Sequence, residues 1–119
     1  MAQEKNFENR FKRWLEQQGI YALGTPRQKM TTPAIGYWEK RWGGGNYTKA
    51  GLPDMHITVN GKSIDVELKA PDGRVSDLQE YIINQINSSG GCALVARPAD
   101  FEKLKTKIKE VANGNFIRD

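Results

Sequence analysis

Two carboxylates and a lysine, brought together by a short turn, are the residues of this chain best suited to chemistry. Pro53-Asp54 precedes one apolar segment, and Glu67-Leu68-Lys69 ends the next. Between the segments lies Asn60-Gly61, a pair typical of two-residue hairpin loops because both central positions need positive φ. Counting outward from this loop along both strands places Asp54 opposite Glu67. The sequence therefore predicts two acidic groups and an ammonium group at one spot.

The same register divides the hairpin into an apolar and a polar face, because side chains alternate along a strand. The apolar face comprises Met55, Ile57, Val59, Ile64, Val66 and Leu68, and the polar face comprises Asp54, His56, Asp65, Glu67 and Lys69. Facing carboxylates repel each other unless a positive charge lies between them. Oxygen ligands, in a chain with one histidine and one cysteine, favour Mg²⁺ or Mn²⁺ over zinc. Lys69 could then reach an attacking water or the scissile phosphate, as metal-assisted phosphodiester hydrolysis requires.

The chain resembles the PD-(D/E)XK nuclease superfamily, and within it the virus-type replication-repair nucleases (VRR-NUC) and archaeal-type Holliday junction resolvases. The resemblance depends on four motifs in the expected order. These motifs are Glu8 ahead of Gly19, Gly51-Leu52-Pro53-Asp54, Glu67-Leu68-Lys69, and Gln79 within Ser76-Asp77-Leu78-Gln79. The resemblance covers about positions 4–97, which is nearly the whole chain.

The resemblance implies a restriction-endonuclease-like core and a Mg²⁺-dependent endonuclease acting on DNA, with Mn²⁺ as a substitute. It assigns the cation to Asp54, Glu67 and the main-chain carbonyl of Leu68, with Glu8 binding directly or through water. By the same resemblance, Lys69 orients the attacking water and stabilises phosphate charge, and Gln79 assists. Small members of the family further imply a 5′-phosphate product and a homodimer that cuts branched DNA, such as a Holliday junction, at two symmetric positions.

Three of these residues also have simpler interpretations. Gln79 could only close a capping box with Ser76, and Glu8 could be an ordinary helix acid. His56 could be a cross-strand partner of Asp65 or line a substrate groove. Two other function classes stay open as well: a sequence-specific endonuclease, and a non-catalytic DNA-binding module with the same fold.

Positive charge is concentrated ahead of the predicted acid pair. Residues 1–52 carry nine Lys and Arg against four Asp and Glu, whereas residues 53–119 carry nine against ten. Basic and aromatic side chains that could contact phosphates and bases alternate between positions 24 and 52. The predicted DNA-binding residues are Arg27, Lys29, Trp38, Lys40, Arg41, Tyr47 and Lys49. The alternative is a solvated loop whose aromatic residues pack on the core.

The scaffold predicted around these residues is α/β, with a central mixed β-sheet flanked by helices in the order α-β-β-β-α-β-α. Between the first strand, Ile20 to Ala22, and the hairpin, the pattern is irregular, with at most a helical turn around Tyr37 to Trp42. A fully buried strand is expected from Cys92 to Ala96. The three helices are predicted from the apolar stripes Phe7, Phe11, Trp14, Leu15 and Gln18; Leu78, Ile82, Ile83 and Ile86; and Phe101, Leu104, Ile108 and Val111.

Composition is consistent with one domain over residues 1–119, close to the commonest domain size. No apolar run approaches the roughly 20 residues of a membrane span, and the N-terminus lacks the apolar core of a signal peptide. We therefore expect a protein of the cytoplasm, with no membrane partner. Cys92, the single cysteine, is expected to be a small buried hydrophobic residue.

Overall fold

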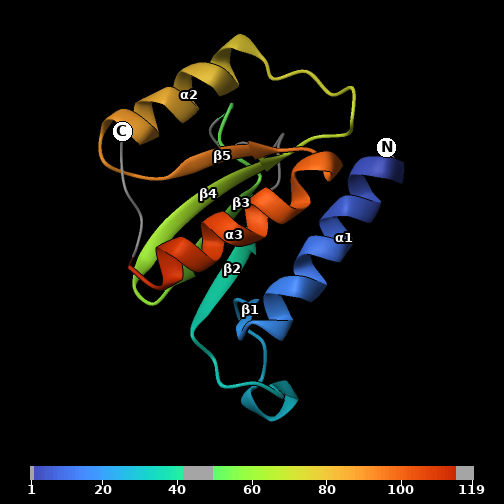
Figure 1. Ribbon diagram of the computed structural model, residues 1–119, viewed down its shortest axis with the longest axis vertical. Coiled ribbons are helices and arrows are strands. Elements are labelled where there is room, and N and C mark those ends of the chain that lie inside the picture. The colour runs from blue at the N-terminus through green and yellow to red at the C-terminus, as the bar shows by residue number, and fades with distance from the viewer. Residues whose placement is uncertain (1, 42–49, 115–119) are drawn as a thin grey trace.

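A five-stranded mixed sheet forms the centre of the molecule (Figure 1), and the computed structural model describes residues 2–41 and 50–114. The strands are β1 (Ile20–Ala22), β2 (Gly36–Lys40), β3 (Met55–Val59), β4 (Lys62–Leu68) and β5 (Ala93–Ala96). They lie side by side in sequence order. β1 is parallel to β2, β3 is antiparallel to both β2 and β4, and β5 is parallel to β4. The predicted fold class is confirmed.

Two helices, α1 (Ala2–Gln17) and α3 (Phe101–Ala112), cover one face of the sheet (Figure 1). The apolar residues of their predicted stripes are buried, whereas Gln18, also assigned to the first stripe, lies beyond the end of α1 and is half-buried. Phe101 of α3 contacts the rings of Phe7 and Phe11 edge to face, at centroid distances of 5.6 and 6.4 Å. The helices meet the apolar face of the hairpin, whose six predicted residues are all at most 1% exposed. Burial of these side chains supplies the main driving force for folding.

The predicted hairpin register is confirmed. His56 pairs with Asp65 and Val59 with Lys62, and both turn residues have positive φ, 49° at Asn60 and 79° at Gly61. These are the dihedrals of the predicted two-residue turn. Because the register holds, the polar residues of β3 and β4 face away from α1 and α3.

The segment from Gly36 to Lys40 is a strand, so the prediction of an irregular stretch with a helical turn was wrong there. It pairs with β1 on one side and with β3 on the other. A Cβ at Gly36 would lie 2.1 Å from the Thr58 carbonyl oxygen, so only glycine allows this approach. The pairing joins residues distant along the chain, which local periodicity does not report. Four strands therefore precede the next helix, where three were predicted.

α2 (Asp77–Ser88) begins at the predicted capping box. Ser76 Oγ accepts from the Gln79 amide at 3.1 Å, and the Ser76 amide donates to Gln79 Oε1 at 2.9 Å. Ile82 and Ile83 are buried, but Leu78 is 47% exposed, so its predicted inward position was wrong. Leu78 lies in the first turn of α2, where its side chain is next to Gly51.

The strand predicted as fully buried is only partly so. Cys92, Ala93 and Ala96 are buried as expected, whereas Leu94 and Val95 are partly exposed. β5 is the last strand of the sheet, so one side of it has no neighbouring strand. None of the helices in the described ranges is long and apolar enough to cross a membrane.

Candidate active site

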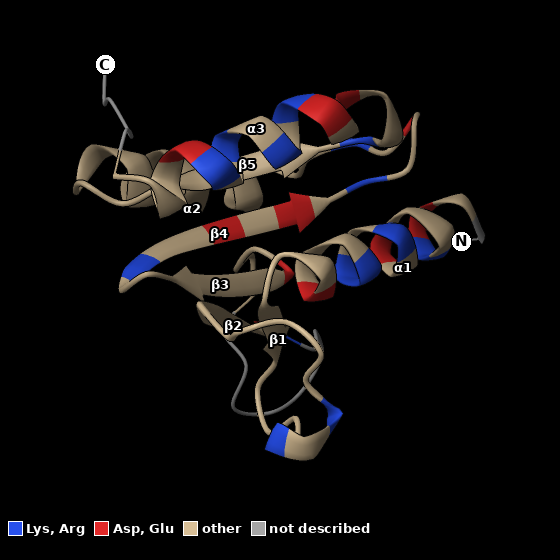
Figure 2. Cartoon of the chain, turned by 60° about the horizontal axis from the view of Figure 1, so that its bottom comes forward, with Lys and Arg blue, Asp and Glu red and all other residues tan. Residues whose placement is uncertain are grey.

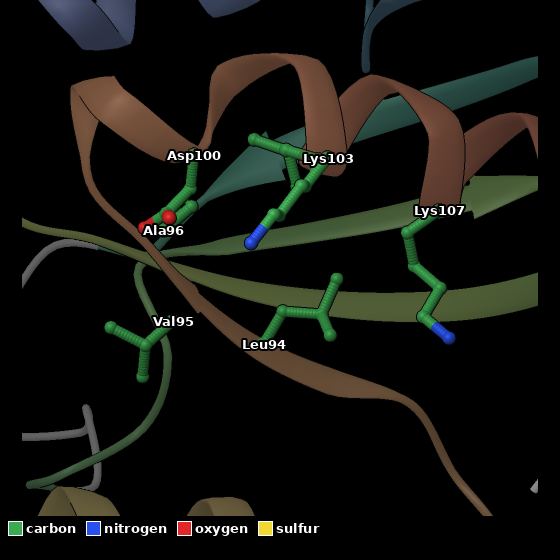
Figure 3. Close-up of a pocket in the computed structure, with 7 residues that line it drawn as sticks. Leu94, Val95, Ala96, Asp100, Lys103 and Lys107 are labelled. Atoms are coloured by element: carbon green, nitrogen blue, oxygen red, sulfur yellow. The ribbon is translucent and has the colours of Figure 1, made fainter.

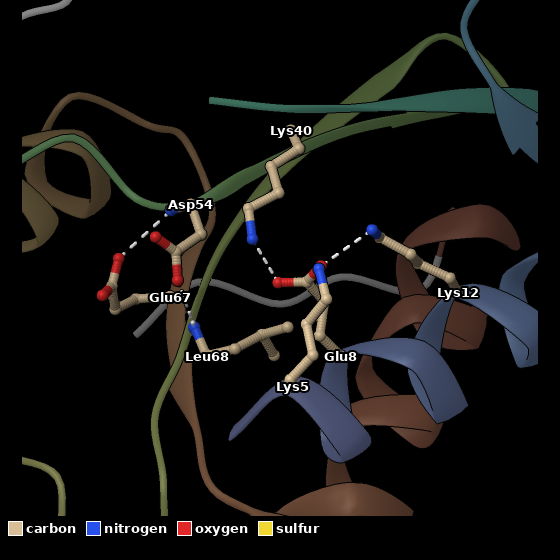
Figure 4. Close-up of polar contacts among 7 residues, drawn as sticks. All are labelled: Lys5, Glu8, Lys12, Lys40, Asp54, Glu67 and Leu68. Carbon is tan, nitrogen blue, oxygen red and sulfur yellow. Dashed lines mark hydrogen bonds and ion pairs between the residues drawn. The ribbon is translucent and has the colours of Figure 1, made fainter. Parts of the chain in front are cut away.

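Asp54 and Glu67 lie side by side at one end of the hairpin, one position beyond the last ladder pair, Met55 and Val66, in agreement with the predicted register (Figure 4). The Asp54 amide donates to Glu67 Oε1 at 3.1 Å, and the Leu68 amide donates to Asp54 Oδ2 at 3.2 Å. Glu67 is 3% exposed and Asp54 is partly buried. The two carboxylates therefore share a small volume from which water is largely removed.

The backbone at Asp54 is fixed by the segment that leads into β3. Pro53 is buried, and the Arg41 amide donates to the Asp54 carbonyl at 2.6 Å while Arg41 Nη1 donates to the Pro53 carbonyl at 3.2 Å. Gly51 adopts φ +84°, which favours glycine, and a Cβ at this position would lie 2.7 Å from Leu78 Cγ of α2. Arg41 and Gly51 thus position the predicted acid.

Lys69 and Gln79 both contact Oε2 of the Glu67 carboxylate, the oxygen that does not accept from the Asp54 amide. Lys69 Nζ lies 3.2 Å from Glu67 Oε2, and Gln79 Nε2 donates to the same oxygen at 3.1 Å. Because Gln79 Oε1 also accepts from the Ser76 amide, one side chain both caps α2 and touches the acid. The two interpretations of Gln79 in the sequence are therefore compatible.

The acid pair is destabilised in its charged form. Burial raises the pKa of Asp54, and the Leu68 amide and Lys40 only partly oppose this effect. Burial, followed by repulsion from Asp54, raises the pKa of Glu67, and Lys69 acts in the opposite direction. Both shifts favour the neutral acids. A cation placed between the carboxylates would relieve both effects.

Glu8 on α1 lies in a cluster of ammonium groups (Figure 4). Its carboxylate, 3% exposed, pairs with Lys5 at 3.2 Å, with Lys12 at 2.7 Å and with Lys40 from β2. Burial alone would raise the pKa of Glu8, but hydrogen bonds from the three lysines outweigh it and lower this pKa to about 2. The interpretation of Glu8 as a solvent-facing helix acid was therefore wrong. Its role as a metal ligand stays a prediction.

The acid pair has the donor chemistry of a site for a hard divalent cation. Among the described residues, no three His, Cys, Asp or Glu side chains gather as a metal-binding group. The ligand set that the family resemblance implies, Asp54, Glu67, the Leu68 carbonyl and Glu8, stays a prediction. The acid pair suits Mg²⁺, which typically takes one or two carboxylates and completes its shell with water and substrate phosphate.

The predicted DNA-binding residues are distributed over several environments. Arg27 and Lys29 are exposed on a short 3₁₀ helix between β1 and β2, where Figure 2 shows basic positions projecting from the body of the molecule. Lys40 pairs with Glu8, and Arg41 Nη1 pairs with Asp65 Oδ1 at 2.9 Å. The remaining predicted residues are Trp38, which packs against the core, and Tyr47 and Lys49, which lie outside the described residues.

Trp38 is partly buried and packs against the hydrophobic core. Its indole Nε1 is buried without a hydrogen-bond partner among the described residues, and Lys12 Nζ lies 5.1 Å from the ring centroid. The ring face expected to stack on a base is thus in contact with a lysine. This arrangement matches the alternative in which the aromatic residues pack on the core.

His56 has the cross-strand partner that the register predicted. His56 Nδ1 lies 2.9 Å from Asp65 Oδ1, the same oxygen that contacts Arg41. Sequence analysis missed Arg41 as the second partner of Asp65, because Arg41 directly follows β2, a strand that was not predicted. It also missed Lys5 and Lys12 beside Glu8, although their i−3 and i+4 spacing on a helix was a usable signal.

A cavity of about 240 Å³ lies between β5 and α3 (Figure 3). Leu94, Leu104, Asp100 and Lys103 are among its lining residues, and none of the five predicted catalytic residues lines it. It is therefore separate from the acid pair.

Comparison of the chain with protein-family models, with curated proteins and with solved structures gives no match. The functional interpretation consequently depends on the residues and geometry of the acid pair.

Proposed function

We propose that this protein is a divalent-cation-dependent nuclease that hydrolyses phosphodiester bonds in DNA. The observation that supports the proposal most strongly is the pair formed by partly buried Asp54 and buried Glu67, with Lys69 Nζ 3.2 Å from Glu67. Two desolvated carboxylates that repel each other lower the stability of the folded protein. Binding of a cation between them during the reaction would explain why both are present.

In this proposal Asp54, Glu67 and the Leu68 carbonyl hold Mg²⁺ or Mn²⁺. The cation supplies Lewis-acid stabilisation of phosphate charge and makes water a better nucleophile. Lys69 donates hydrogen bonds that orient the attacking water and stabilise the charge developing on phosphate oxygens. Gln79 restrains the Glu67 carboxylate through its amide.

Branched DNA and a homodimer belong to the same proposal, and both follow from the family resemblance. One cation centre makes one cut, so resolving a four-way junction requires two centres related by symmetry. A two-fold dimer is the commonest way for a small protein to supply them. Light scattering with and without junction DNA tests the dimer.

The decisive experiment is cleavage of labelled duplex, nicked, flap, fork and four-way junction DNA with Mg²⁺ or with EDTA. Wild type should cut the junction in Mg²⁺ but not in EDTA, and Glu67→Gln should cut it in neither condition. Glu80→Gln is the matched control because Glu80 is exposed on α2. Discrete fragments from linear duplex would instead indicate a sequence-specific endonuclease. Binding without any cleavage would contradict the nuclease.

A further inference from the structure

Three lysines surround one carboxylate at Glu8. Lys5 and Lys12 come from the same helix, and Lys40 comes from β2. Within this group three positive charges face one negative charge, and Lys40 also acts on the neighbouring Asp54. We call Lys5, Lys12, Lys40 and Glu8 the lysine cluster.

This number of lysines exceeds what Glu8 needs. A buried carboxylate is strongly destabilising when unpaired, but one well-placed ammonium group is enough to pair it. The lysine side chains become more exposed from Lys40 to Lys12 to Lys5, at 18%, 23% and 56%. The excess charge therefore extends from the interior to the surface.

Glu8 and Trp38 together restrict where Lys12 can lie. The ammonium group is 2.7 Å from the Glu8 carboxylate and 5.1 Å from the Trp38 ring centroid. An ammonium group carries three N–H donors, so these contacts leave Lys12 able to bind an oxygen from solution. A lysine held in this way loses less conformational entropy on binding than a free surface lysine.

The lysine cluster adjoins the acid pair. Figure 4 shows the Lys40 side chain between Glu8 and Asp54. Glu4 on α1 also acts on Asp54, since its charge raises the pKa of that carboxyl. A divalent cation at Asp54 and Glu67 would offset the charge of that pair, and the lysine cluster would then be the positive surface beside it.

We propose that the lysine cluster is a phosphate-binding subsite that holds the DNA strand beside Asp54 and Glu67. In this assignment Glu8 orders the lysines and does not bind the cation. The identity of the ligand, a phosphodiester backbone, depends on the proposed function. The subsite adds Lys5 and Lys12 of α1 to the DNA-binding residues expected from the sequence.

The test measures binding of labelled junction and duplex DNA by fluorescence anisotropy in EDTA, so that cleavage plays no part. Lys5→Gln/Lys12→Gln should raise Kd roughly tenfold and lower the slope of log Kd against log salt concentration by about 2. The control, Lys62→Gln/Lys103→Gln, removes the same charge from exposed sites on the hairpin turn and α3. It should change both quantities much less.

Equal effects in the two double variants would overturn the subsite. Lys5→Gln alone keeps the test valid if the double variant unfolds, because the Lys5 side chain is 56% exposed. Its Kd should rise roughly threefold. Competition by inorganic phosphate beyond that of chloride at equal ionic strength would identify free phosphate as the ligand, and would overturn the strand assignment.

Two further results separate this inference from the proposed function. DNA binding that depends on the lysine cluster, in a protein that cuts nothing, would contradict the nuclease and leave the subsite intact. Titration with Mn²⁺ should give the same affinity for Glu8→Gln as for wild type within about threefold, and no binding for Asp54→Asn. Loss of Mn²⁺ binding in Glu8→Gln would make Glu8 a cation ligand and would overturn its assigned role.

Discussion

Asp54 and Glu67 hold each other in place through the backbone while their charges repel. The Asp54 amide donates to the Glu67 side chain at 3.1 Å, and the amide after Glu67 donates to the Asp54 side chain at 3.2 Å. These reciprocal bonds prevent the carboxylates from rotating apart. The arrangement is preorganised for a cation, because the cost of bringing the two charges together is met during folding.

Asp54→Asn should stabilise the metal-free protein and remove its response to Mg²⁺. The substitution deletes one of two repelling charges but keeps an oxygen to accept from Leu68, so we expect a gain on the order of 1 kcal/mol and a melting temperature about 3–5 °C higher. Wild type should be stabilised by Mg²⁺, since a ligand that binds only the folded state raises stability, by about 2.7 kcal/mol at 100 times Kd. Differential scanning fluorimetry measures both effects.

The pH dependence of the stability difference between Asp54→Asn and wild type provides a control for this prediction. Because the pKa values of Asp54 and Glu67 are raised in the folded state, the cost of their charges is present at neutral pH. It is relieved as pH falls and the folded protein takes up protons. The advantage of Asp54→Asn should therefore shrink on acidification. Equal Mg²⁺ responses in mutant and wild type would refute the cation site.

Ser76→Ala and Gln79→Glu should separate the two contacts of Gln79. Ser76→Ala removes the cap acceptor and should cost about 1 kcal/mol of stability, with cleavage rate unchanged where the protein is folded. Gln79→Glu keeps an oxygen for the Ser76 amide but replaces the donor to Glu67 with a third carboxylate. The repulsion between this carboxylate and Glu67 should also lower stability at neutral pH, by an amount that shrinks on acidification, and the cleavage rate should fall. Urea unfolding and a junction-cleavage assay distinguish the variants, and an unchanged cleavage rate in Gln79→Glu would make Gln79 only a cap.

The acid pair was predictable from sequence because its geometry is local. Asn60-Gly61 determines the turn, the turn determines the register, and the register brings Asp54 to Glu67 without reference to the rest of the chain. The capping box at Ser76 was predictable for the same reason.

The contact of Lys40 with Glu8 and the strand β2 were not predictable in this way, because both depend on contacts between distant segments, whereas Lys5 and Lys12 lie near Glu8 on the same helix. Lys40 reaches Glu8 across 32 positions of sequence. β2 is recognisable only when it pairs with β1 and β3. The position of the Trp38 side chain against the core depends on β2, because Trp38 is part of that strand. Periodicity within a short window contains none of this information.

Glu8→Gln should destabilise the protein at neutral pH and much less in acid. The pKa of Glu8 is lowered from 4.5 to about 2, so its ion pairs contribute stability above pH 4.5, and this contribution declines as pH falls toward 2. Allowing for the partial exposure of the three lysines, the loss at pH 7 is on the order of 2 kcal/mol. Urea unfolding at pH 7 and pH 3 measures it. A pH-independent difference would show that packing, not charge, explains the effect.

Lys69→Met should abolish cleavage while leaving DNA affinity within a few-fold of wild type. Lys69 Nζ is 3.2 Å from Glu67 and its side chain is 15% exposed, so in the proposed reaction it acts on the reacting phosphate more than on the bound strand. Loss of one such donor typically costs roughly a hundredfold or more in rate.

Removing the ammonium also removes a partner that opposes the raised pKa of Glu67, so residual activity should need a higher pH. Lys69→Arg keeps the charge and should retain part of the rate at the wild-type pH. Single-turnover cleavage across pH, with binding measured in EDTA, resolves these effects, and a Lys69→Met protein that cuts at the wild-type rate would exclude Lys69 from the chemistry.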